Sequence, residues 1–169
     1  MSLPPPEERF MGCIDDLISV VKDCLEHVQY RGYTILSPAL ISLAGAAIQR
    51  YDNKFITETF IKYSYLYWDE IRNHNETFFT EHSNEIFQEL PLGNIDSFKK
   101  IFTLLDNDGN KVINQDYRDD IWAMFESLVK ISINYIHKNR ELINGTYKFE
   151  FYEYIDLNNE ANKWKMTLK

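Results

Sequence analysis

The sequence is poor in cysteine, glycine and proline. Its 169 residues include two cysteines, six glycines and five prolines. A disulfide framework needs more cysteines than this, and a high content of proline and glycine is typical of disordered or fibrous chains. A chain of this length can bury a sizeable core without disulfide or metal staples. We therefore expect a fold that is held together by its own hydrophobic core.

Positive charge is also scarce. Lys and Arg together number 18 against 26 Asp and Glu, which gives a formal net charge of −8. Proteins that bind nucleic acid or an anionic membrane surface through general electrostatics carry a basic excess. We therefore expect no nucleic-acid partner.

Long hydrophobic runs are missing as well. The uncharged stretch Gly32–Gln49 is interrupted by Ser37, Pro38 and Ser42, whereas a membrane-spanning helix needs about 20 predominantly apolar residues. This stretch predicts a buried helix of about ten residues and no membrane span. Residues 1–6 have neither the cationic segment nor the apolar segment of a secretory signal, and we expect them to form an extended tail.

The two cysteines, Cys13 and Cys24, lie eleven residues apart in a segment with helical periodicity. On a helix they share one face at a separation of about 16 Å along the axis. A disulfide requires Cα atoms within about 7 Å of each other. The spacing therefore predicts two reduced, buried thiols, as is usual for an intracellular protein.

Apolar residues are plentiful, and they recur with the period of an α-helix. Hydrophobic residues make up 44% of the chain and aromatic residues 15%. The spacing i, i+3, i+4, i+7 predicts helices over residues 7–30, 38–51, 54–72, 77–90, 97–105 and 115–142. Residues 147–168 fit both a strand and a helix, and helix is favoured because a lone strand has no partner. We predict an all-α fold.

Two of these segments, 54–72 and 115–142, are apolar around most of their circumference. A helix that is hydrophobic nearly all round is typical of the centre of a fold. We therefore predict a single helical domain over residues 1–169, a bundle of about six to seven helices around two hydrophobic central helices.

The sharpest local motif is the polar loop between the last two of these predicted helices. Asp106, Asp108 and Asn110 occupy the first, third and fifth ligand positions of an EF-hand calcium loop. Position six is Lys111 where the motif needs Gly, and position twelve is Tyr117 where it needs a bidentate Glu. We favour a helix connection built from Asx and Asp-Gly turns. A weakly calcium-binding, calcium-responsive module that uses Asp106, Asp108 and Asn110 is the alternative.

Catalytic signatures are missing from the sequence. It has no glycine-rich phosphate loop and no nucleophile elbow. The adjacent carboxylates Asp69–Glu70 and Asp119–Asp120 point about 100° apart on a helix and form no acid–base pair. Glu70 and His74, at i, i+4, are interpreted as a surface helix contact. A non-enzymatic protein without a cofactor is favoured, and a helical enzyme of unknown type stays open as an alternative.

The aromatic side chains of the two central segments suggest a contact surface. Tyr and Trp are enriched at the hot spots of protein interfaces, and two helices this apolar in a small chain make an exposed partner surface plausible. The candidate interface residues are Tyr65, Trp68 and Trp122, although a core position is favoured for any one of them taken singly. We therefore predict a soluble protein that acts through a protein partner or through self-association.

Three segments carry a resemblance to a known group of proteins. The segments Phe60–Ile71, Phe98–Phe102 and Trp122–Arg140 resemble uncharacterised proteins of large nucleocytoplasmic DNA viruses. The resemblance spans residues 54–164 and brings with it no residue of known chemical role. It implies an intracellular viral protein, in the cytoplasm or in the virion, which is a structural component or acts on the host.

Overall fold

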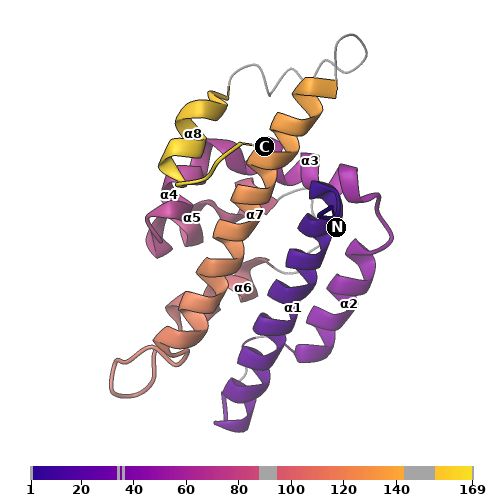
Figure 1. Ribbon diagram of the computed structural model, residues 1–169. Coiled ribbons are helices and arrows are strands. Elements are labelled where there is room, and N and C mark those ends of the chain that lie inside the picture. The colour runs from indigo at the N-terminus through magenta and orange to yellow at the C-terminus, as the bar shows by residue number, and fades with distance from the viewer. Residues whose placement is uncertain (1, 34, 36, 88–94, 143–154, 169) are drawn as a thin grey trace.

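The protein is an assembly of helices (Figure 1). The computed structural model describes residues 2–33, 35, 37–87, 95–142 and 155–168. These residues form no strand, only one isolated β-bridge between Leu105 and Lys111. The elements are α1 (Pro6–Tyr30), α2 (Pro38–Ile48), α3 (Asn53–Ser64), the 3-10 helix η1 (Tyr65–Tyr67), α4 (Trp68–Arg72), α5 (Glu76–Phe87), α6 (Ile95–Thr103), α7 (Gln115–Leu142) and α8 (Leu157–Lys163). The predicted all-α class is confirmed.

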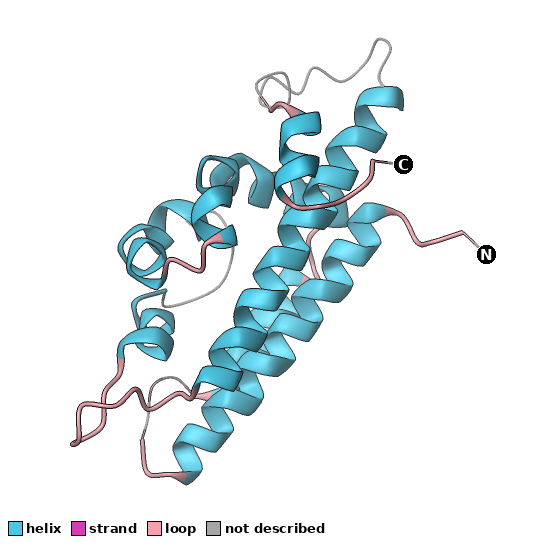
Figure 2. Cartoon of the chain, turned by 60° about the vertical axis from the view of Figure 1, so that its left-hand side comes forward, coloured by secondary structure: helices cyan, strands magenta, loops and turns pink. Residues whose placement is uncertain are grey.

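The centre of the fold is the antiparallel pair α1 and α7. These are the longest helices, of 25 and 28 residues, and they lie side by side over most of their length (Figures 1 and 2). Their apolar stripes face each other and are fully buried at positions such as Cys24, Val28, Val129 and Ile136. The bounds of α7 are those the sequence predicts. The second central helix is α1, whereas the sequence pattern pointed to residues 54–72.

Residues 54–72 do not form the single helix that was predicted. The backbone tightens into the 3-10 helix η1 after Ser64, and α4 then starts at Trp68. A straight helix with apolar side chains all round would leave some of them in water. The break turns Trp68 and Ile71 into the core and leaves Leu66 exposed in the 3-10 turn. Tighter 3-10 turns often mark such breaks between helical segments.

Helix ends follow local chemistry. The Asp52 side chain accepts a hydrogen bond of 2.7 Å from the Lys54 amide and caps α3, a role that Asp often has at a helix start. Asp156 caps α8 in the same way through the Asn159 amide at 3.1 Å. Ser37 precedes α2 without a side-chain cap. Pro91 with Gly93, and Asn144 with Gly145, are helix-stop residues in the sequence. They lie outside the described residues, as does the tail as far as residue 154.

Helix α2 lies beside α1 at the edge of the molecule (Figure 1). Gly45 permits the close contact, since a Cβ at this position would lie 3.1 Å from Cδ1 of Ile18. Ile41, Gly45 and Ile48 are buried against the rest of the protein. The sequence predicted a buried helix here, and this is wrong for half of its surface, because α1 covers one side only. No helix in the described part of the chain is long and apolar enough to cross a membrane.

Candidate functional site

The polar loop with EF-hand-like spacing is a closed turn. The Asp106 carboxylate accepts hydrogen bonds of 2.9 Å from the amides of both Asp108 and Asn110. The Asp106 amide in turn donates to the Asn110 carbonyl at 2.8 Å. Gly109 has a φ of +81°, a left-handed conformation that glycine adopts without strain. This is the Asx and Asp-Gly turn chemistry that the sequence favoured.

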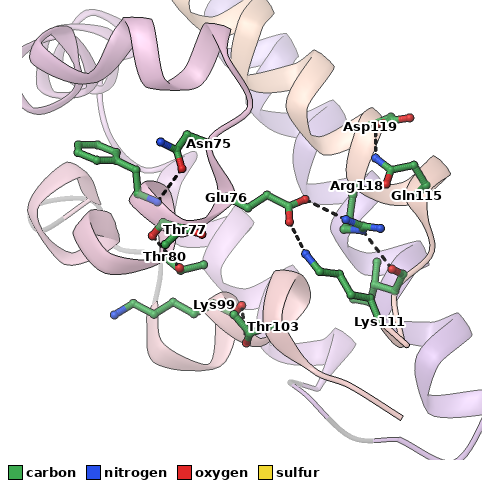
Figure 3. Close-up of polar contacts among 12 residues, drawn as sticks. Asn75, Glu76, Thr77, Thr80, Lys99, Thr103, Lys111, Gln115, Arg118 and Asp119 are labelled. Atoms are coloured by element: carbon green, nitrogen blue, oxygen red, sulfur yellow. Dashed lines mark hydrogen bonds and ion pairs between the residues drawn. The ribbon is translucent and has the colours of Figure 1, made fainter. Parts of the chain in front are cut away.

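Lys111, which takes the place of the EF-hand glycine, points away from this turn to Glu76 at the start of α5 (Figure 3). Arg118 of α7 approaches the other carboxylate oxygen of Glu76 at 3.1 Å. Partial burial of Glu76 opposes ionisation, but the hydrogen bonds and charges of the two cations outweigh it and lower the pKa of Glu76. The three side chains therefore form an ion-pair cluster that joins α5 to the loop and to α7.

Two arginines fasten the second half of the loop. Arg31 donates from Nη1 to the Val112 carbonyl at 2.8 Å, and Arg118 donates from Nε to the Ile113 carbonyl at 3.3 Å. The side chains of Val112 and Ile113 are each 1% exposed. The loop is thus tied to α1, α5 and α7, which indicates a structural junction.

The predicted calcium ligands do not converge with further acidic groups. Asp108 and Asn110 are exposed, and Asp106 is occupied by backbone amides. Among the described residues, no group of three or more His, Cys, Asp or Glu side chains is placed to hold a metal ion. Calcium binding by Asp106, Asp108 and Asn110 stays a prediction that the geometry does not strengthen.

The structure corrects two of the three predicted interface residues. Trp68 is 2% exposed and Trp122 is 1% exposed, so neither presents a surface to a partner. Trp68 donates from Nε1 to the Ser64 hydroxyl at 3.0 Å, and Trp122 packs against Phe102. Both tryptophans are core residues. Tyr65 is half-buried against the same core, and its role at an interface stays a prediction.

His74 pairs with a residue that the sequence did not indicate. It contacts the Glu126 carboxylate on α7 and stacks on Trp122 with ring centroids 5.2 Å apart. The predicted contact with Glu70 is wrong, because Glu70 instead accepts a hydrogen bond from the Asn75 side chain. His74 has a φ of +52° at the end of α4, and this turn carries its ring away from the helix surface and onto α7.

The predicted state of the cysteines is confirmed. Cys13 and Cys24 are free and buried. Burial raises the pKa of each thiol to about 12, and the charge of Asp16 contributes to the shift at Cys13. A thiol needs to ionise before it reacts as a nucleophile. Neither cysteine is therefore a candidate for catalysis.

Glu58 and Tyr135 form a polar contact between α3 and α7. The Tyr135 hydroxyl donates to Glu58 Oε1 at 2.5 Å. Burial raises the pKa of Glu58 above its ordinary value, although the hydrogen bond from Tyr135 and the charge of Lys54 act in the opposite direction. The Tyr135 ring is 1% exposed and its hydroxyl is occupied by this bond, so the pair links two helices and offers no obvious reacting group.

An exposed apolar surface lies on the outer side of α2. Leu40 is 51% exposed and Leu43 is 65% exposed, and the small side chains beside them are exposed or half-buried. We call this surface the α2 face, and it consists of Ala39, Leu40, Leu43, Ala46 and Ala47. It carries no charge.

Two further exposed aromatic side chains follow α2 in the chain. Tyr51 and Phe55 are 46% and 45% exposed and stack with ring centroids 5.5 Å apart. The other large apolar side chains that are exposed in the described residues are separated along the chain, at Leu3, Tyr30, Leu66 and Leu105. Single exposed side chains are normal on protein surfaces. A group of exposed apolar side chains on one uncharged helix is less common, and it makes this helix a candidate contact site.

A comparison with protein-family models, curated proteins and solved structures finds no match to this chain in any of the three. Function is therefore inferred from the residues and their placement. The loop junction, the ion-pair cluster and the Glu58–Tyr135 contact each have a structural role. The α2 face has no such role within the described chain, and it is the candidate functional site.

Proposed function

We propose that this protein is non-enzymatic and acts by binding a protein through the α2 face. The observation that carries the proposal is the exposure of Leu40 and Leu43 on a helix without charge. Covering apolar surface contributes about 25 cal/mol per Å². A partner that covers the two leucines would therefore gain binding energy without separating any charged group from water.

The charge distribution favours a protein partner over the other classes. The net charge of −8 opposes contact with nucleic acid or with an anionic lipid surface. Helices that lie in a membrane interface carry Lys and Arg on their polar side, whereas residues 32–49 contain neither. An apolar surface on another protein matches the α2 face better than either alternative.

The sequence resemblance of residues 54–164 supports an intracellular viral setting for this contact, in the cytoplasm or in the virion. The proposed surface lies outside the resembling segments, on residues 39–47. The viral setting and the contact surface are therefore independent parts of the proposal, and each has its own test.

The contact surface is tested by site-specific photo-crosslinking in the cells that produce the protein. A photoreactive residue at position 43 is expected to form covalent adducts, and Leu40→Glu added to the same chain is expected to remove them. The matched control carries the photoreactive residue at position 66, where Leu66 is 70% exposed in η1.

Equal adduct yields at positions 43 and 66, or adducts that survive Leu40→Glu, would contradict the proposed surface. Circular dichroism and the thermal midpoint of each variant show whether the fold is retained. The viral setting is checked separately by mass spectrometry of purified virions and of infected cells. Absence of the chain from both samples would contradict the viral setting.

A further inference from the structure

We propose that the partner of the α2 face is the same face of a second copy of this chain, in antiparallel contact about a two-fold axis at Leu43. This inference rests on the proposed function and names the partner of that surface. A two-fold contact requires a patch that is complementary to itself. The sequence and exposure of α2 meet this requirement.

The large and small side chains of the α2 face are arranged symmetrically around Leu43. In an antiparallel pair, residues at equal distances from the axis face each other. Leu40 would lie against Ala46 of the second copy, and Ala39 against Ala47 of the second copy, while Leu43 meets its own equivalent. Large side chains opposite small ones let the two helix surfaces interdigitate. The α2 face is therefore complementary in shape to the same face of a second copy.

The spacing of the small residues also favours close approach of two helices. Ala39, Leu43 and Ala46 follow the i, i+4, i+7 spacing of one helix face. All three are exposed in the structure. Interaxial distances between packed helices are about 8–10 Å, depending on the side chains at the contact. Because alanines lie on both sides of Leu43, we expect the interaxial distance between the two α2 helices to be near the short end of this range.

Charge directs self-association to this face. Two chains that each carry a net charge of −8 repel each other. Contact through residues 39–47 brings no like charges directly together, because the stretch 32–49 is uncharged. The remaining repulsion acts at long range and is screened by salt. Dimerisation is therefore expected to strengthen as NaCl concentration rises.

The proposed contact is small. Two copies of the α2 face would bury less than the roughly 1,200–2,000 Å² of a standard specific interface. We therefore expect a weak, concentration-dependent dimer, and we take a Kd on the order of 10 μM as the working value.

Sedimentation velocity with charge-swapped variants tests the two-fold axis. The unmodified chain is expected to shift from monomer to dimer between about 1 and 300 μM, a range that brackets the expected Kd. Leu43→Glu and Leu43→Lys are each expected to stay monomeric, and an equimolar mixture is expected to dimerise again because position 43 faces itself. Leu66→Glu, an exposed leucine outside α2, is the control and should dimerise normally.

A cross-link test reports the register directly. Leu43→Cys is expected to form a covalent dimer under mild oxidation. Leu40→Cys is expected to cross-link to Ala46→Cys in a mixture and not to itself. The native thiols do not interfere, since Cys13 and Cys24 are buried. Leu66→Cys gives the background of random collisions.

The outcomes separate the two proposals. An unmodified chain that stays monomeric at all concentrations, or Leu43 variants that dimerise individually, would overturn self-pairing. In that case, adducts to a different protein at position 43 would still support the proposed function. If Leu40→Cys cross-links to itself as efficiently as it cross-links to Ala46→Cys, the antiparallel register is overturned.

Discussion

At the scale of single residues, the buried hydroxyls of Ser64 and Ser132 each form a hydrogen bond with a residue four positions away. Ser64 is fully buried, and its hydroxyl accepts the hydrogen bond of the Trp68 indole at 3.0 Å. Ser132 is also fully buried and donates to the Leu128 carbonyl at 2.7 Å. A buried donor that loses its acceptor costs about 1–3 kcal/mol. Position 64 therefore requires a residue that is small enough to be buried there and that can accept the hydrogen bond of the Trp68 indole.

Removal of the Ser64 hydroxyl is expected to destabilise the fold. Ser64→Ala leaves the Trp68 indole without its acceptor inside the core, and we expect the free energy of unfolding to fall by about 1–2 kcal/mol. Urea denaturation monitored by tryptophan fluorescence measures the change. The control is Ser127→Ala on α7, whose hydroxyl makes a more exposed bond and whose loss should cost less than about 0.5 kcal/mol. Equal effects at the two positions would contradict this account.

The Glu76 cluster is expected to make stability dependent on pH. The pKa of Glu76 is lowered from 4.5 in the folded state, so its contribution is present above pH 4.5 and is lost as pH falls through the lowered folded value. Glu76→Gln is expected to cost about 1 kcal/mol at pH 7 and progressively less below pH 4. Denaturant titrations of both proteins between pH 2.5 and 7 give this difference.

The control for this cluster is Glu81→Gln, at an exposed position of α5. It should leave the pH dependence of stability unchanged. A difference between Glu76→Gln and the unmodified protein that persists undiminished at pH 2.5 would show that the ionised carboxylate is not responsible.

At the scale of elements, α2 has two sides with different roles. Ile41 is 7% exposed and packs against the core, whereas Leu43, two residues later, is 65% exposed. Successive helical residues point about 100° apart, so two positions suffice to change sides. The composition of α2 hides this difference, because both sides are apolar. Packing against α1 makes one of them interior.

The two sides of α2 are expected to respond differently to truncation. Ile41→Ala removes buried methyl groups and should lower the free energy of unfolding by about 2–4 kcal/mol. Leu43→Ala should change it by less than about 0.5 kcal/mol when measured on dilute protein. Urea denaturation at about 1 μM, below the expected Kd, checks both. A cost at Leu43 as large as that at Ile41 would mean that another part of the chain covers the α2 face.

At the scale of the whole molecule, the packed pair α1 and α7 contributes many of the fully buried core side chains. The two cysteines of α1 lie in this pair, with Cys24 completely buried. The Cys13 thiol lies 3.5 Å from the Met124 carbonyl of α7. Access to these thiols requires α1 to separate from α7, which removes the centre of the core. Opening at this position is therefore expected to coincide with global unfolding.

Thiol labelling is expected to report global stability. Burial raises the pKa of Cys13 and Cys24 to about 12, and reagent should reach them only through the unfolded state. Labelling of the native protein is expected to be at least about 10³-fold slower than in denaturant, and Ile41→Ala should accelerate it. Leu66→Cys provides a rapidly labelled control site. Native labelling at the denatured rate would exclude a core centred on α1 and α7.

The sequence by itself determined the helical class, most helix ends and the state of the thiols. Each of these depends on interactions within a few residues. The periodic apolar pattern specifies α1 and α7, Asp52 caps α3 through the Lys54 amide, and the spacing of Cys13 and Cys24 excludes a disulfide between them on one helix.

Tertiary structure alone decided which apolar surfaces are covered and which charges meet. Glu76 contacts residues 35 and 42 positions away in the chain, and no local pattern indicates such pairs. Trp68 is buried among core residues, and Leu43 is exposed because it lies on the side of α2 that faces away from α1. Burial depends on how many elements surround a side chain, which is a property of the packed molecule and not of the residue type.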